Sequence, residues 1–205
     1  TEAKLRLVSV KKYAKILVVF LNDLHLIPKV VNELLPYKPE SIETFDDNTF
    51  RLAIKFLPEM IKKMKGGIIS FGVKFLPELW MTLTGGIPKI VLLPEFTGDD
   101  EKEVEQRISA VYEKLKAMGL KMHIAQSAFE ADKYRIMRRE SFNLLRQKVK
   151  NKQTAPFIDD FIVKPEKLPE FFPELYKILD QYPSLVYTIA GHAGDGNFHI
   201  IPLMN

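Results

Sequence analysis

The chain has 205 residues, of which 46% are hydrophobic and 27% are charged, and its net charge is +4. These proportions are ordinary for a globular protein, and the length is enough to bury a substantial core. Cysteine is absent, which excludes disulfides and any cysteine-ligated metal or iron–sulfur centre. No apolar run reaches the length of a membrane-spanning helix, and no secretory signal opens the sequence. We therefore expect a cytoplasmic protein with one domain over residues 1–205.

The first quarter of the chain alternates between strand and helix signals. Residues 14–21 are apolar and β-branched, as in a strand, and residues 24–35 have helical spacing that Pro36 helps to end. A short strand over 41–45 and a helix over 48–56 follow. Together these segments predict a strand–helix–strand–helix unit.

Residues 51–90 differ from the rest of the chain. They carry seven basic and two acidic side chains, so the basic excess of the chain lies here. The pattern Lys-Phe-Leu-Pro-Glu occurs at 55–59 and again at 74–78, and two copies are too few for a repeat architecture. We interpret 51–90 as an apolar-basic helical insertion. It can either cover the core as a basic lid or contact an anionic membrane surface or a partner.

The remaining sequence predicts further strand–helix pairs and a closing hairpin. In chain order, the expected elements are a strand over 87–96, a helix with apolar positions at 104, 108, 111, 115 and 118, a strand over 121–126, a helix over 129–149, a strand over 157–163, a helix over 165–181, and two strands over 186–192 and 198–203. Thr97 or Asp99 is expected to cap the first of these helices, and Gly119 suits its C-terminal end.

The order of these elements predicts an α+β fold. Strand–helix–strand units with few tight hairpins are typical of ferredoxin-like split βαβ units that share a sheet. We therefore expect a largely antiparallel sheet, covered by helices on one face.

The segment Gly191–His199 holds two histidines around a glycine-rich turn. If Asp195-Gly196 forms a two-residue hairpin turn, His192 and His199 lie directly opposite each other on one face of the hairpin. Their Cβ atoms would then be about 4.5–5.5 Å apart. Two imidazoles held in this way supply half of a metal site. The alternative is a plain cross-strand pair beside an ordinary turn.

The stretch His192–His199 resembles the H-x-G-D-G-N-x-H signature of the C-terminal domain of FAD-linked oxidases. That family includes flavin-dependent D-lactate dehydrogenases, glycolate oxidase subunits and D-2-hydroxyglutarate dehydrogenases. Three more segments are similar to parts of the family: residues 1–7 to the junction after its FAD-binding domain, 138–142 to its Arg-Glu helix, and 156–163 to the strand after that helix. The resemblance implies the same α+β architecture and an FAD-binding domain that is absent from this chain.

The resemblance also implies that His192 and His199 are catalytic residues and ligands of a divalent metal such as zinc or manganese. In the family, a glutamate well downstream of the hairpin, beside another histidine, completes the site, and this sequence stops at Asn205. We therefore expect half a metal site, with metal bound weakly or not at all. Of the adjacent Asp159 and Asp160, strand alternation lets one face this site.

Arg138 and Asn197 are the candidate substrate-binding residues. A guanidinium grips a carboxylate through parallel hydrogen bonds, which suits an anionic 2-hydroxy acid. Arg138 and Arg139 point about 100° apart on a helix, so only one is expected to face the site. The family pattern W-x-x-R-E favours Arg138, although Arg135 stands at the tryptophan position. A solvated basic helix face is the alternative for the arginines, and a residue tolerating positive φ after the turn is the alternative for Asn197.

Two functions follow from these observations. The first is the substrate- and metal-binding part of an FAD-dependent dehydrogenase that oxidises a D-2-hydroxy acid, such as lactate or glycolate, with hydride transfer to flavin. Because FAD would be bound by the missing domain, the fragment alone is expected to be inactive. The second is a non-catalytic module that associates with a membrane surface or a partner through residues 51–90. The sequence allows a peripheral membrane contact and a homodimer. Nucleic acid is not an expected partner, because the basic segment lacks the aromatic spacing of a nucleic-acid-binding surface.

Overall fold

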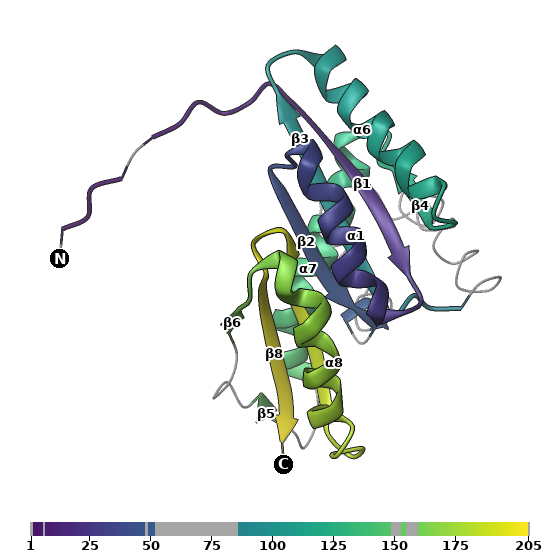
Figure 1. Cartoon of the computed structure of the whole chain (residues 1–205). Coiled ribbons are helices and arrows are strands. Elements are labelled where there is room, and N and C mark those ends of the chain that lie inside the picture. The colour runs from purple at the N-terminus through teal and green to yellow at the C-terminus, as the bar shows by residue number, and fades with distance from the viewer. Residues whose placement is uncertain are drawn as a thin grey trace.

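Figure 1 shows the computed structural model of the chain. It describes residues 2–5, 7–47, 49–51, 86–148, 153–154 and 160–204. The segment before Tyr13 runs away from the body of the protein as an extended arm, on which Leu7 and Val10 are almost fully exposed. The other described segments build an α+β structure around one sheet.

Two strand–helix–strand units make the first half of the sheet. Their elements are β1 (Tyr13–Leu21), α1 (Ile27–Leu34), β2 (Ser41–Asp46), β3 (Ile90–Gly98), α6 (Glu101–Lys116) and β4 (Lys121–Ile124). The strands lie in the order β4-β1-β3-β2, and every pairing is antiparallel. This arrangement confirms the predicted ferredoxin-like split βαβ unit.

The second half of the chain extends the same sheet beyond β2. Its elements are α7 (Ala128–Lys148), β5 (Gln153–Thr154), β6 (Phe161–Ile162), α8 (Leu168–Leu179), β7 (Val186–His192) and β8 (Asn197–Met204). β7 pairs with β2, β8 pairs with β7, and the short strands β5 and β6 both pair with β8. In the described part of the chain the sheet therefore has eight strands, and β2 joins its two halves.

Helices cover both faces of the sheet, so the expectation of cover on a single face is wrong. α1, α6 and α8 lie over one face, where Leu17 and Val19 of β1 belong to their core. α7 crosses the other face and packs in a second core with Ile16 and Val18. The unbroken apolar run of β1 explains this, because a strand buried on both faces shows no polar alternation.

The ends of α6 lie close to the predicted ones. Its N-cap is Asp100, whose Oδ1 accepts a 2.8 Å hydrogen bond from the backbone N–H two residues later. The predicted caps Thr97 and Asp99 are wrong, because β3 continues through Thr97 to Gly98 and the helix begins only after Asp100. Gly119 has a φ of 73°, the left-handed conformation expected just after a helix.

The predicted insertion at 51–90 lies, from residue 52 to residue 85, outside the described residues. Its helices and its contact with a membrane or a partner therefore stay predictions. Within the described part of the chain, no helix combines the length and the apolar character needed to cross a bilayer.

Candidate functional site

The hairpin between β7 and β8 has a longer turn than the sequence pattern predicts. His192 pairs with Asn197, and His199 pairs with Ala190, so the two histidines do not lie directly opposite each other. Residues 193–196 form the connection. The predicted two-residue turn is wrong, and the register differs from it by two positions.

The structure gives a physical reason for the longer turn. Ala193–Asp195 form a 3-10 turn, and Gly196 follows with a φ of 67°, the left-handed region that favours glycine. The backbone of Val163 lies against this glycine, because its N–H donates a 2.9 Å hydrogen bond to the Gly196 carbonyl. A Cβ at Gly196 would lie only 1.7 Å from the Val163 carbonyl oxygen. The end of β6 therefore fixes the turn in its four-residue form.

The two imidazoles nevertheless lie close together. A register shift of two residues keeps every side chain on its face, whereas a shift of one would reverse it. His192 and His199 are therefore diagonal neighbours, with ring centroids 6.0 Å apart and ring planes at 81°. They share the face that α7 crosses, because Ala190 packs in the α7 core whereas Phe198, beside His199, packs in the opposite one.

A carboxylate and a guanidinium contact His192. Its Nδ1 lies 2.8 Å from Oε1 of Glu43, and Nη2 of Arg138 lies 2.8 Å from Oε2 of the same carboxylate. The Arg138 Nη2 also lies 3.5 Å from the Nε2 of His192, at the outer limit of a hydrogen bond. The three side chains therefore form a closed triangle. All three are half-buried and accessible to solvent, with 26% of Glu43, 26% of Arg138 and 42% of His192 exposed.

The backbone register explains why these residues meet. Glu43 of β2 stands directly across from His192 of β7. Glu43 shares its face with Phe45, two residues later, which packs in the α7 core. On α7, Arg138 reaches this face of the sheet, whereas Arg139 is exposed. Arg138 is also the arginine that the family pattern favours, and its role in binding substrate stays a prediction.

Sequence reasoning missed Glu43. It lies 149 positions before His192, and nothing in its local sequence marks it as part of a site. The pairing of β2 with β7 is the only signal that brings the two together, and that pairing is not visible in the strand pattern.

Asn197 and Asp160 lie beside the second histidine. The Asn197 amide Nδ2 donates hydrogen bonds to Oδ1 of Asp160 and, at 3.3 Å, to the carbonyl of Phe161. Nδ1 of His199 lies 3.6 Å from the same Asp160 oxygen. Asn197 does not adopt positive φ, so that alternative is wrong, and its amide nitrogen instead ties β8 to β6. Asp159 lies outside the described residues.

The donor set fits part of a metal site. His192 presents Nδ1 to a carboxylate, which is the usual way in which proteins orient a metal-binding imidazole. His199 has Asp160 near its own Nδ1. Among the described residues, however, no group of three histidine, cysteine, aspartate or glutamate side chains is placed to hold a metal. These residues therefore fit two ligands of such a site and do not complete it.

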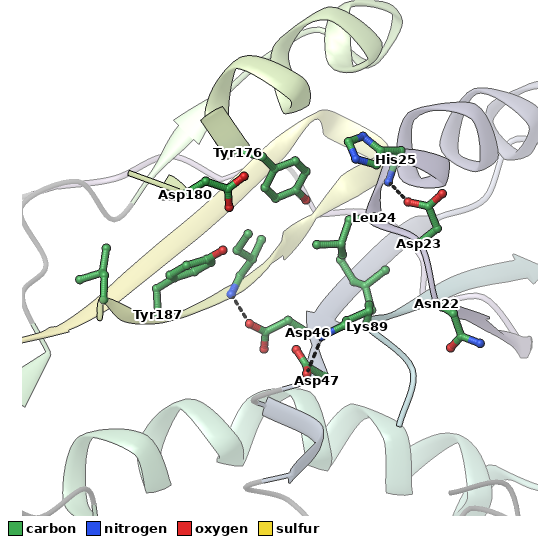
Figure 2. A pocket seen from close by; sticks show the side chains of 13 residues that line it. Asn22, Asp23, Leu24, His25, Asp46, Asp47, Lys89, Tyr176, Asp180 and Tyr187 are labelled. Atoms are coloured by element: carbon green, nitrogen blue, oxygen red, sulfur yellow. Dashed lines mark hydrogen bonds and ion pairs between the residues drawn. The ribbon is translucent and has the colours of Figure 1, made fainter. Parts of the chain in front are cut away.

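A separate cavity of about 630 Å³ lies at the end of β2 (Figure 2). It opens on the other face of the sheet, since Asp46 follows Phe45 of the α7 core and so points the opposite way. Side chains that contribute charge or hydrogen-bonding groups to its wall include Asp23, His25, Asp46, Tyr176, Asp180 and Tyr187. None of the residues predicted from the sequence as site residues lines this cavity.

Among the side chains that line this cavity, Asp46 carries a buried carboxyl group. Its Oδ1 accepts a 2.9 Å hydrogen bond from the backbone N–H of Thr49, and its Oδ2 accepts one of 2.8 Å from Ile189. Burial nevertheless raises the pKa of Asp46 to about 6, because removing the charge from water outweighs these donors. Burial likewise raises the pKa of Tyr176.

Comparison with known proteins decides the family. Residues 10–205 match the family described as FAD linked oxidases, C-terminal domain. The chain belongs to this family. This FAD-linked oxidase C-terminal domain is 29% identical to a D-2-hydroxyglutarate dehydrogenase of Pseudomonas putida over 208 residues, which is 100% of the chain and 19% of that protein. A D-2-hydroxyglutarate dehydrogenase of Escherichia coli (strain K12) is 26% identical over 118 residues, which is 54% of the chain and 12% of that protein. The chain thus spans less than a fifth of the length of these curated relatives.

Solved structures share the fold of the FAD-linked oxidase C-terminal domain. Alkyldihydroxyacetonephosphate synthase matches with a TM-score of 0.58 and 12% identity, over 95% of this chain and 37% of that one. A 4-ethylphenol oxidase from Gulosibacter chungangensis matches with a TM-score of 0.57 and 10% identity, over 94% of this chain and 39% of that one. Identities this low show the fold alone, and they agree with the predicted α+β class.

Proposed function

We propose that this domain is the substrate-binding part of an FAD-dependent oxidoreductase that oxidises a D-2-hydroxy acid. The observation that supports this most directly is the triangle of Glu43, Arg138 and His192, with the ring of His199 at 6.0 Å. It sets a cation that suits a carboxylate beside an imidazole that can take a proton. The curated relatives that the domain resembles are named for the oxidation of a 2-hydroxy acid.

Arg138 is assigned to the substrate carboxylate. A guanidinium presents its N–H donors in a planar fork, a geometry that matches the two oxygens of a carboxylate. Hydrogen bonds to a charged group contribute about 1.5–3 kcal/mol, which corresponds to roughly ten- to hundredfold in affinity. The position of Arg138, half-buried against the sheet, limits its rotation and favours one orientation of the substrate.

His192 is assigned to the substrate hydroxyl. Oxidation of a secondary alcohol removes the hydroxyl proton and a hydride from the same carbon. With Nδ1 engaged by Glu43, the Nε2 of His192 is the atom that can accept the proton. His199 lies on the same face and is placed to contact the same substrate end.

The proposal includes two further chemical groups, FAD and a divalent metal ion. FAD, bound by a domain that is not part of this chain, would supply the acceptor for the hydride. A divalent ion such as zinc or manganese would polarise the hydroxyl when bound. Nε2 of His192 cannot bind this ion and accept the proton at the same time, and the two histidines provide only two ligands. No step is therefore assigned to the ion, and we expect this chain alone to hold it weakly.

The test uses the full-length protein that contains this domain. We expect it to bind flavin and to oxidise at least one of D-lactate, glycolate and D-2-hydroxyglutarate. Arg138→Met should raise KM roughly ten- to hundredfold. His192→Asn should lower kcat about 100- to 10,000-fold, the usual contribution of a general base.

Arg139→Met is the matched control, because it removes the neighbouring charge on an exposed part of α7. We expect its kinetic constants to stay close to those of the wild type. A full-length protein without flavin, or a His192→Asn variant with wild-type kcat, would disprove the proposed function.

A further inference from the structure

Glu43 contacts both of the side chains to which the proposed function assigns a role. One of its oxygens lies 2.8 Å from Nδ1 of His192, and the other lies 2.8 Å from Nη2 of Arg138. We propose that Glu43 is a positioning residue that holds His192 in its Nδ1–H tautomer and fixes this imidazole relative to Arg138. The role in catalysis rests on the proposed function, whereas the effect on the tautomer does not.

The hydrogen-bonding rules of the two neighbours select the same tautomer. An ionised carboxylate only accepts hydrogen bonds, so the imidazole nitrogen that faces Glu43 must carry the proton. A guanidinium only donates, so the 3.5 Å contact of Nε2 with Arg138 agrees with a lone pair on Nε2 but is too long to fix the tautomer alone. The shorter contact with Glu43 therefore places the proton on Nδ1 and leaves the lone pair on Nε2.

This lone pair is what the chemistry of the site requires. Nε2 lies on the side of the ring away from Glu43, 3.5 Å from Nη2 of Arg138, and with its lone pair it can accept a proton. In the other tautomer Nε2 would carry a hydrogen and could not. Glu43 therefore controls whether the histidine is competent, without itself touching the substrate.

A second carboxylate–arginine pair joins the same helix to the sheet and provides a control. Glu95 of β3 lies 2.5 Å from Nη2 of Arg135, which stands three residues before Arg138 on the same helix. Both pairs attach α7 to the sheet, and their glutamates share one face because Glu95 pairs with Ser41, two residues before Glu43. In the part of the chain that the structure describes, the Glu95 carboxylate contacts Arg135 and does not contact His192 or His199. Glu95→Gln is thus a control that loses a helix-to-sheet ion pair and leaves His192 alone.

Nitrogen NMR of histidine reads the tautomer directly. The 205-residue chain contains four histidines, and after labelling with ¹⁵N-histidine the His192 signals are identified by their loss in His192→Gln. Under conditions in which the imidazole is neutral, we expect Nδ1–H in the wild type, in Glu95→Gln and in Glu43→Gln, where the amide oxygen still accepts. Glu43→Ala should show a mixture of both tautomers. A wild type with the proton on Nε2, or a Glu43→Ala chain that keeps Nδ1–H, would overturn the inference.

Kinetics of the full-length protein keep the inference testable if Glu43→Ala does not fold. We expect Glu43→Gln, which loses the charge, to lower kcat/KM about tenfold, and Glu43→Ala to lower it up to about a hundredfold, as for other partners of ligating histidines. Glu95→Gln should stay near the wild-type value. If Glu43→Gln and Glu95→Gln behave alike while His192→Asn is inactive, the inference fails and the proposed function stands. If His192→Asn is fully active, the proposed function fails, and the tautomer measurement still decides what Glu43 does.

Discussion

The buried carboxyl of Asp46 should make the stability of the chain depend on pH. Its pKa is about 6 in the folded protein against an ordinary value of 3.8, so the folded state binds this proton more tightly than the unfolded chain does. The free energy of unfolding must therefore fall as the pH rises through this interval. Each unit of pKa difference corresponds to about 1.4 kcal/mol, so the full effect is about 3 kcal/mol. Between pH 4 and pH 8 most of it, about 2–3 kcal/mol, should be lost.

Asp46→Asn isolates this contribution, because the amide does not ionise. The substitution replaces one acceptor oxygen by an NH₂ group, so a backbone N–H from Thr49 or Ile189 loses its partner. This loss costs about 1–3 kcal/mol at any pH. We therefore expect the variant to be less stable than the wild type at pH 4 and nearly as stable at pH 8. Urea unfolding followed by circular dichroism at both pH values measures the two differences.

Asp180→Asn is the control for this measurement. Asp180 also lines the cavity (Figure 2), but it is exposed to solvent. Its substitution should change the unfolding free energy by less than about 0.5 kcal/mol. If the difference between wild type and Asp46→Asn is the same at pH 4 and pH 8, burial does not hold the proton on Asp46 and the reasoning is refuted.

Two further predictions concern turns and caps, and both are measured by urea unfolding. Gly196→Ala should cost more than about 2 kcal/mol, because it combines positive φ with a Cβ 1.7 Å from the Val163 carbonyl oxygen. Gly119→Ala, with a similar φ of 73° and open space around it, should cost only about 1–2 kcal/mol, and equal losses would show that the contact with Val163 is unimportant. Asp100→Ala should cost about 1 kcal/mol through loss of the α6 cap. Asp99→Ala should cost less. If Asp99→Ala instead costs more than Asp100→Ala, Asp99 is the N-cap, as the sequence predicted.

The sequence predicted the face of the histidines but not their register. Side chains alternate between the two faces along β7 and β8, so only an odd shift in register moves a side chain to the other face. The predicted register was wrong by two residues, which left both rings on one face. Turn length, in contrast, depends on the contact of Gly196 with Val163. That contact is made by a strand more than thirty residues earlier, so a local turn rule cannot include it.

The same distinction holds for the wider fold and site. The α+β class follows from the alternating strands and helices. Cover on both faces of the sheet was not predicted, although the continuous apolar run of β1 is typical of a strand buried on both sides. Arg138 was found because a motif and a helical face agree. Glu43 was not, because its role depends on which strand lies beside β7. Asp46 was missed for a similar reason, since its donors come partly from β7.

The pairing of β2 with β7 has a consequence for the time course of folding. The two side chains that meet there, Glu43 and His192, are 149 positions apart. Among the described elements, β3, α6, β4, α7, β5, β6 and α8 lie between them in sequence. Contacts of such long range form slowly. The ability to bind an anion should therefore lag behind the appearance of helical signal when the unfolded chain is diluted from denaturant.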